Sequence, residues 1–304
     1  MSKRATTVVR PGGSQTRVKL GIVGDYLKGF ARASQSARDR IYIDGLAGSG
    51  TGIDPRTGHL YDGSARRCFD VEPPFTEVYI IEKDEARAAE LEKIAAEHEG
   101  AKAICGDVNI EIPKLLATLN PKAPTFAFLD PEGTELGWPT VKALADHKRG
   151  RGRYKVELLI LFPLQMSHRR LLNFKSGLGV TPEHAKLLDF TLGAETPWRE
   201  IVARRLIGEI PDAEQMEFAF LDAYCDGLQN RLGYEHVLHV AVAGDSGAPL
   251  YYLVFASDCP AGKTIMRWEF GASHEEQAQL FNLGEYTEGI SFDPDRTKNY
   301  RSAP

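Results

Sequence analysis

Residues 41–52, IYIDGLAGSGTG, run from an apolar segment through an acidic residue into a stretch with four glycines. This order is typical of the first strand of a parallel α/β sheet, where ligands bind beyond the carboxyl ends of the strands. Glycines suit such a loop because its backbone must turn sharply and come close to a ligand. No Gly-Lys-Ser/Thr follows, so a P-loop is not indicated. Taken alone, the glycines are equally compatible with an ordinary turn.

The rest of the chain alternates between strand and helix patterns. Apolar runs of strand length recur at 78–81, 101–105, 125–129 and 156–162, with helical patterns between them at 85–99, 112–119 and 138–148. This alternation predicts a parallel sheet with helices on both faces. Two further runs, 236–242 and 250–257, are close enough to form an antiparallel hairpin. We therefore expect an α/β, Rossmann-like fold of five parallel strands plus a C-terminal hairpin, the layout of the class I methyltransferase sheet.

Composition divides the chain into a central domain and two tails. Residues 1–16 are rich in Gly, Pro, Ser and Thr and predict a flexible tail. Residues 17–270 form the expected α/β domain, with a helical insertion at about 169–232, and 271–304 predict an extended tail. No apolar run approaches the roughly 20 residues of a membrane helix, and the N-terminus does not look like a signal peptide. We therefore expect a cytoplasmic protein with no membrane contact.

Charge and cysteine content limit the possible partners. The net charge of -5 argues against a protein wrapped in nucleic acid. One segment, 147–155, is locally basic and is a candidate nucleic-acid contact, although such runs often serve solubility. Its basic residues are Lys148, Arg149, Arg151, Arg153 and Lys155. The four cysteines are scattered without a CxxC pair, so neither a disulfide framework nor a metal site is indicated.

Acidic residues stand at the ends of the first three predicted strands. Asp44 opens the glycine loop, and its carboxylate could accept hydrogen bonds from a ligand ammonium or an ordered water. Glu82 ends the second strand, where a carboxylate commonly accepts both hydroxyls of a ribose. Asp107 follows the third strand and could receive an adenine amino group, or serve equally well as a helix cap. This series suits a nucleoside that carries an amino acid, because it would repel a pyrophosphate.

The fourth strand ends in TFAFLDPEG, residues 125–133. Asp130 lies at the mouth of the same crevice, and Pro131 stiffens the turn and lacks an N–H donor. A hydrogen-bond acceptor there can orient a nucleophilic amine or hydroxyl toward an electrophilic methyl group, so catalysis would consist mostly of positioning. The alternative is a simple Asp-Pro turn at a strand end.

These motifs, in this order, resemble the three-Cys-motif partner proteins (TcmP), which are similar to class I S-adenosylmethionine-dependent methyltransferases. The resemblance covers about residues 17–270, and its carriers include IDGLAGSGTG, IIEKD, GDVN and FLDPEG. It implies a ribose-binding Glu82 and an adenine-side Asp107. It also implies a cofactor cradle formed by Asp44, Gly45, Ala47, Gly48 and Gly50.

The same resemblance bears on catalysis and on partners. Asp130 and Pro131 match the family's DP-x-G turn, which is similar to the DPPY motif of amino-methylating enzymes. DPPY ends in a ring that stacks on a flipped base, whereas Glu132 and Gly133 offer none, which argues against base methylation. The family is named for a neighbouring three-cysteine protein similar to iron–sulfur enzymes.

Three hypotheses follow. The first is an S-adenosylmethionine-dependent methyltransferase that acts on a nucleic acid or on another amine or hydroxyl acceptor, beside a three-cysteine partner. The second is a non-catalytic S-adenosylmethionine-binding partner of that three-cysteine protein, and the third is a nicotinamide dehydrogenase. The predicted hairpin and the acidic series disfavour the third.

Overall fold

A seven-stranded mixed sheet forms the centre of the molecule. The computed structural model describes residues 10–147, 154–162, 180–243 and 249–280. Along the sheet the strands follow the order β6 (Ala101–Cys105), β5 (Glu77–Glu82), β2 (Ile41–Gly45), β7 (Thr125–Leu129), β8 (Glu157–Phe162), β10 (Pro249–Ser257) and β9 (His236–Ala243). The first five strands are parallel, and β10 pairs antiparallel with both β8 and β9. This is the class I methyltransferase arrangement, so the predicted fold class is confirmed.

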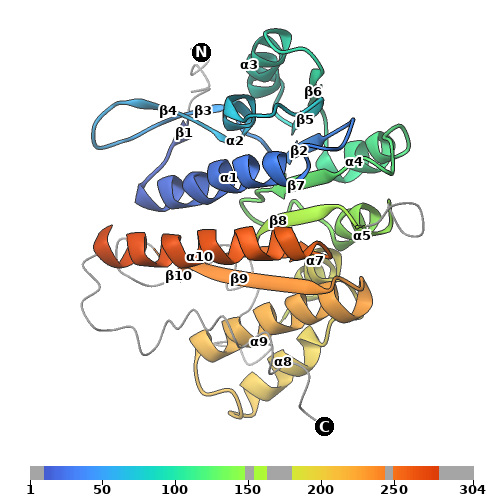
Figure 1. Cartoon of the computed structure of the whole chain (residues 1–304). Helices are drawn as coiled ribbons and strands as arrows, with labels where there is room; N and C mark the ends of the chain where they lie inside the picture. The colour runs from blue at the N-terminus through green and yellow to red at the C-terminus, as the bar shows by residue number, and fades with distance from the viewer. Residues whose placement is uncertain (1–9, 148–153, 163–179, 244–248, 281–304) are drawn as a thin grey trace, which may run out of the picture.

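Helices cover both faces of this sheet (Figure 1). One face carries α1 (Ser14–Ala33), α3 (Glu85–Ala96) and α10 (Pro260–Leu280). The other carries α4 (Val108–Leu116), α5 (Trp138–His147), α7 (Pro182–Leu192), α8 (Trp198–Leu206) and α9 (Ala213–Asp226), which continues into a π-helical turn at Gly227–Arg231. The central strands β2, β7 and β8 are buried along their whole length. Their nearly unbroken apolar runs, interrupted by the buried Asp44 and Glu157, follow from this burial on both faces.

The N-terminal helix begins earlier than the sequence pattern indicates. In the sequence, the spacing of Leu20, Val23, Leu27 and Phe30 predicts one apolar face of a helix from Arg17. That face is confirmed, because all four side chains are buried. However, α1 starts at Ser14, so its first turn lies inside the segment predicted as a flexible tail. Residues 1–9 lie outside the described ranges. The early start brings one more turn of helix over the glycine loop.

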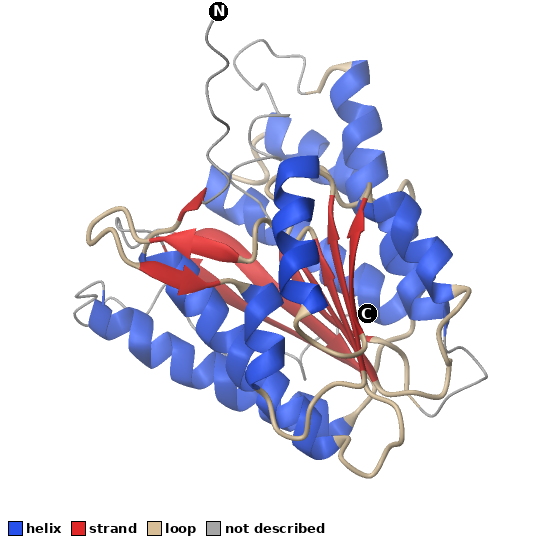
Figure 2. Ribbon diagram, turned by 90° about the horizontal axis from the view of Figure 1, so that it is seen from above, coloured by secondary structure: helices blue, strands red, loops and turns tan. Residues whose placement is uncertain are grey.

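A second, three-stranded sheet lies apart from the main one (Figure 2). It consists of β1 (Arg10–Pro11), β3 (Thr51–Ile53) and β4 (Leu60–Asp62), followed by the short helix α2 (Ser64–Arg67) and a 3-10 turn at Cys68–Asp70. Strands of two or three residues are too short for an alternating pattern to reveal, so the sequence did not indicate them. Because β3 continues directly from the glycine loop, this sheet forms part of the site.

The C-terminal boundary also differs from the prediction. Helix α10 runs to Leu280, whereas the sequence predicted an extended tail from 271. The segment 271–280 contains Ala, Glu and Gln, which are good helix formers and extend the helix. Residues 281–304 are not among those described, and no helix within the described ranges is long and apolar enough to cross a membrane.

Most of the basic segment lies outside the described residues. Only its end, from Tyr154, is described. Lys155 Nζ forms an ion pair with Asp258 Oδ2 at 2.9 Å and donates a hydrogen bond to the carbonyl oxygen of Gly233 at 2.6 Å. Lys155 is therefore engaged in the fold, which leaves the nucleic-acid prediction with Lys148, Arg149, Arg151 and Arg153.

Candidate functional site

Three glycines shape the backbone where the glycine loop follows β2. Gly45 sits against β7, where an added Cβ would lie 2.7 Å from Leu129 Cδ2. Gly48 and Gly50 have φ values of +67° and +71°, in the left-handed region that favours glycine. At Gly48 an added Cβ would meet no atom within 4 Å, because the loop here faces open space. The sequence therefore uses glycine where the loop turns and where it faces a potential ligand.

Leu46 lies between these glycines and also has a positive φ, of 70°. A non-glycine residue in this region costs roughly 1 kcal/mol or more and is often found at functional sites. The amides of Leu46 and Ala47 both donate to the carbonyl oxygen of Ile81, each at 3.0 Å. These two bonds to β5 hold the strained turn in place.

Two adjoining cavities open at this edge of the sheet. The larger, of about 290 Å³, is lined by the loop residues Ala47, Gly48 and Gly50, by Asp130 and Pro131, and by side chains from α1, β4 and β10. The smaller, of about 250 Å³, is lined by residues at the ends of β5, β6 and β7, among them Glu82, Asp107 and Asp130. The two share Leu46, Gly48, Asp130 and Glu132. Together they have the size of a site for a cofactor-sized ligand.

Glu82 is a buried carboxylate that ties the loop to helix α3. Its Oε2 accepts a hydrogen bond from the Gly48 amide at 2.9 Å, and its Oε1 accepts one from the Asp84 amide at 2.8 Å. Arg87 Nη2 lies 3.0 Å from Oε1. A carboxylate has about four lone-pair sites, so three contacts leave room for at least one ligand hydroxyl. Glu82 thus shapes the loop and lines the smaller cavity at the same time.

Asp107 takes the helix-cap role that the sequence left open, and its adenine-side role stays a prediction. It is the N-cap of α4, where its Oδ1 accepts from the Asn109 amide at 2.9 Å, and it also lines the smaller cavity. Although burial alone would raise its pKa, hydrogen bonds from Asn109 and the charge of Lys83 hold the pKa of Asp107 below its usual value. The carboxylate is therefore available as a hydrogen-bond acceptor at neutral pH.

Asp44 is fully buried and lines neither cavity. Its Oδ2 accepts a hydrogen bond from the Tyr42 hydroxyl at 3.1 Å, while its Oδ1 has no hydrogen-bond partner within the described ranges. Burial raises the pKa of Asp44 to about 7, against the lowering effect of the Ser64 and Tyr42 hydroxyls. Because Asp44 lines neither cavity, its unsatisfied oxygen fits an ordered water beneath the loop better than a ligand ammonium.

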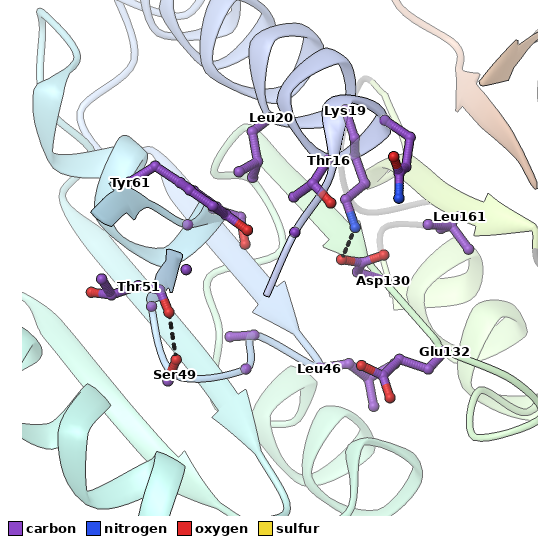
Figure 3. A pocket seen from close by; sticks show the side chains of 18 of the residues that line it. Thr16, Lys19, Leu20, Leu46, Ser49, Thr51, Tyr61, Asp130, Glu132 and Leu161 are labelled. Carbon is purple, nitrogen blue, oxygen red and sulfur yellow. Dashed lines mark hydrogen bonds and ion pairs between the residues drawn. The ribbon is translucent and has the colours of Figure 1, made fainter. Parts of the chain in front are cut away.

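Asp130 lies where the two cavities meet and is paired with a residue that the sequence did not single out. Lys19 points from α1 toward it, and its Nζ lies 2.5 Å from Asp130 Oδ2 (Figure 3). The Asp130 amide donates to the carbonyl oxygen of Gly45 at 3.3 Å, and Pro131 is buried beside it. The strand-ending turn is therefore tied to the glycine loop and to the N-terminal helix.

The N-terminal helix supplies one wall of the larger cavity. Gln15, Thr16 and Lys19 line it from the start of α1, and Tyr61 and Tyr251 line it from β4 and β10. Lys19 Nζ also lies 5.8 Å from the centre of the Tyr251 ring, a cation–π distance. The sequence signal for this wall is the apolar spacing at Leu20, Val23, Leu27 and Phe30, which predicts a helix from Arg17. That spacing does not say which strand end the helix covers.

The predicted cofactor residues thus divide into two groups. Ala47, Gly48, Gly50, Glu82 and Asp107 line the cavities, whereas Asp44 and Gly45 lie beneath the loop. Within the part of the chain that the structure describes, no group of His, Cys, Asp and Glu side chains could hold a metal ion.

The fold is shared with solved structures, at low sequence identity. The chain matches no protein-family model, and no curated protein matches its sequence. Protein LPL1258 from Legionella pneumophila, of family DUF519, is 11% identical with a TM-score of 0.52, over 89% of this chain and 95% of that one.

Weaker matches include an O-methyltransferase family protein from Burkholderia thailandensis, 13% identical with a TM-score of 0.37, over 80% of this chain and 55% of that one. The N-methyltransferase NodS from Bradyrhizobium japonicum is 9% identical with a TM-score of 0.35, over 79% and 95%. The match to LPL1258 shows that the two chains share an α/β fold. The strand order described above is that of the class I methyltransferase sheet.

Proposed function

We propose that this chain is an S-adenosylmethionine-dependent methyltransferase that acts on an amine or hydroxyl acceptor. The position of Asp130 carries the proposal, because its side chain lines both cavities beside the glycine loop. In a cofactor that occupies both cavities, the reactive methyl group would lie near their junction. A carboxylate at that point can orient the acceptor.

The residues of the two cavities suit this cofactor. Glu82 and Asp107, on the smaller cavity, match the hydroxyls of a ribose and the amino group of an adenine. The glycine loop, whose residues line the larger cavity, suits the amino-acid end, and Asp44 lies beneath this loop. The pyrophosphate of a nicotinamide dinucleotide would meet these acids with repulsion, which disfavours a dehydrogenase.

The chemistry that the chain itself would supply is positioning. S-adenosylmethionine, when bound, provides a methyl group on a positively charged sulfur. Asp130 would accept a hydrogen bond from the acceptor N–H or O–H and hold its lone pair in line with that methyl. Lys19 already contacts Asp130 Oδ2, so an acceptor would use the other carboxylate oxygen or replace Lys19.

The proposals for the methyl acceptor and for the partner protein are supported by the sequence alone. The resemblance to three-Cys-motif partner proteins supports a role beside a three-cysteine iron–sulfur-type protein. The basic residues Lys148, Arg149, Arg151 and Arg153 support a nucleic-acid acceptor.

A second candidate function is a non-catalytic S-adenosylmethionine-binding partner of the same three-cysteine protein. The observation that favours it is the ion pair between Lys19 and Asp130, which neutralises the carboxylate that an acceptor would need.

Labelled S-adenosylmethionine separates the two candidates. The protein is incubated with it and with fractionated RNA, DNA, protein and small molecules, in the presence and absence of the three-cysteine partner. Label in one fraction supports the methyltransferase and names the acceptor class. Binding of the cofactor in a calorimeter, with no label transferred even when the partner is present, supports the binding role.

Replacing Glu82 by alanine should weaken S-adenosylmethionine binding at least about tenfold. The variant loses the proposed ribose acceptor and also frees the Gly48 amide, which Glu82 holds at 2.9 Å. Titration calorimetry on the parent and the variant measures the change. Glu85→Ala, which alters an exposed carboxylate in the first turn of α3, is the matched control and should bind as the parent does. Unchanged affinity in Glu82→Ala would show that the ribose assignment is wrong.

A further inference from the structure

One side chain, that of Asn109, joins two segments of the site that are distant in sequence. Its Nδ2 donates to Asp107 Oδ1 at 2.9 Å and to the carbonyl oxygen of Glu135 at 2.6 Å. Its Oδ1 accepts from the Gly137 amide and from Thr140 Oγ1, both at 2.8 Å. The first partner lines the smaller cavity, Glu135 and Gly137 belong to the segment between β7 and α5, and Thr140 lies in the first turn of α5.

These four bonds use the whole hydrogen-bonding capacity of a carboxamide, which has two N–H donors and two lone pairs on its oxygen. Aspartate at this position would lose both donors and place a second charge beside Asp107. Alanine would lose all four bonds. Asparagine therefore matches a geometry that these residues cannot reproduce.

The segment that Asn109 holds is the one that carries the proposed catalytic turn. Residues 130–137 lead from Asp130 and Pro131 to the start of α5, and Asp130, Glu132 and Glu135 line the cavities. At its beginning the segment is tied by the bond from the Asp130 amide to Gly45. At its end it is tied by Asn109.

The end of this segment has little room to move. An added Cβ at Gly137 would lie 2.5 Å from the ring of Phe190 in α7 and 3.2 Å from Asn109 Oδ1. Gly137 is thus held between the carboxamide and an aromatic ring, so a change in the position of Asn109 transmits directly to the loop backbone.

We propose that Asn109 is a positioning residue that couples the adenine side of the cofactor site to the Asp130 turn. This inference rests on the proposed function. Asp107 is both the ligand-facing carboxylate and the acceptor of two hydrogen bonds from Asn109. A ligand that hydrogen-bonds to Asp107 fixes that carboxylate, which in turn fixes Asn109 and the 130–137 loop.

Amide hydrogen exchange with and without S-adenosylmethionine tests the coupling. In the parent, the cofactor should slow exchange across 132–137. In Asn109→Ala without ligand, the Gly137 amide should exchange about tenfold faster, which corresponds to the loss of one to two hydrogen bonds. The cofactor should still bind this variant within about fivefold of the parent affinity, because Asn109 lines neither cavity. It should no longer protect the loop.

Two further variants make the result specific. Asn120→Ala removes an exposed carboxamide whose Nδ2 bonds to Asp39, and it should behave as the parent does. Thr140→Val removes one of the four bonds and should give an intermediate effect, which keeps the test available if Asn109→Ala does not fold. With the acceptor fraction that takes up label, Asn109→Ala should lower kcat at least about tenfold and leave KM for the cofactor near that of the parent.

Failure of the positioning role and failure of the proposed function give different results. A variant that only melts at a lower temperature, yet keeps cofactor-dependent protection of 132–137, overturns the positioning role. Unchanged exchange at Gly137 overturns it as well. A parent that binds no S-adenosylmethionine refutes the proposed function, and the coupling with it.

Discussion

Asp130→Ala should lower the rate of methyl transfer by about two to four orders of magnitude and leave the affinity for S-adenosylmethionine within about threefold of the parent. Asp130 lies at the junction of the two cavities, where it can contact an acceptor. A group that positions only the acceptor contributes to the reaction and not to cofactor binding. The rate is measured with the fraction that takes up label, and the affinity by calorimetry.

The ion pair with Lys19 requires its own controls. Removing Asp130 leaves an ammonium group whose side chain is only 13% exposed, and this charge could itself disturb the site. The double variant Asp130→Asn with Lys19→Met removes both charges and should be as inactive as Asp130→Ala. Asp25→Ala breaks the exposed ion pair between Asp25 and Lys28 on the same helix and should be fully active. If Asp130→Ala transfers methyl at the parent rate, the Asp-Pro turn is only the end of a strand.

Asp44→Asn should change how stability depends on pH. Burial raises the pKa of Asp44 to about 7 in the folded protein, whereas the ordinary pKa of an aspartate is 3.8. Between these two values the unfolded chain releases the proton and the folded chain keeps it, so this group makes the parent less stable as the pH rises. The full difference corresponds to about 4 kcal/mol, an upper bound for a single buried group.

The variant removes this penalty, because asparagine does not ionise. Relative to the parent, Asp44→Asn should therefore gain stability steadily between about pH 4 and pH 7, even though its amide needs a new partner, at a cost of about 1–3 kcal/mol. Urea unfolding of both proteins at several pH values measures the divergence. Asp25→Asn, at an exposed position, should follow the parent curve. Parallel curves for Asp44→Asn and the parent would contradict the assigned pKa.

A buried carboxylate that lowers stability at neutral pH calls for a functional reason. Strongly shifted pKa values occur often at binding and catalytic sites, where a ligand compensates the cost. The unsatisfied Oδ1 of Asp44, beneath a strained loop, has this character. Because Asp44 lines neither cavity, we infer that an ordered water beneath the loop, and not the ligand itself, pairs with this oxygen.

The sequence by itself determined the main sheet and the order of the acids along its edge. Central strands that are buried on both faces need nearly unbroken apolar runs. The helices between them need apolar residues with a 3.6-residue period, so both kinds of element can be recognised from the local sequence. Parallel strands place their carboxyl ends at one edge. The positions of Glu82, Asp107 and Asp130 around one crevice followed from that rule and from the ends of β5, β6 and β7.

Only the tertiary structure decided which side chains complete the site. Lys19 meets Asp130 across 111 positions of sequence, and Asn109 meets Gly137 across 28. The small sheet that adds Tyr61 to the cavity is built from strands of two and three residues. Such contacts produce no local sequence pattern. They depend on how helices and loops pack against the sheet, whereas periodicity reports only on a single segment.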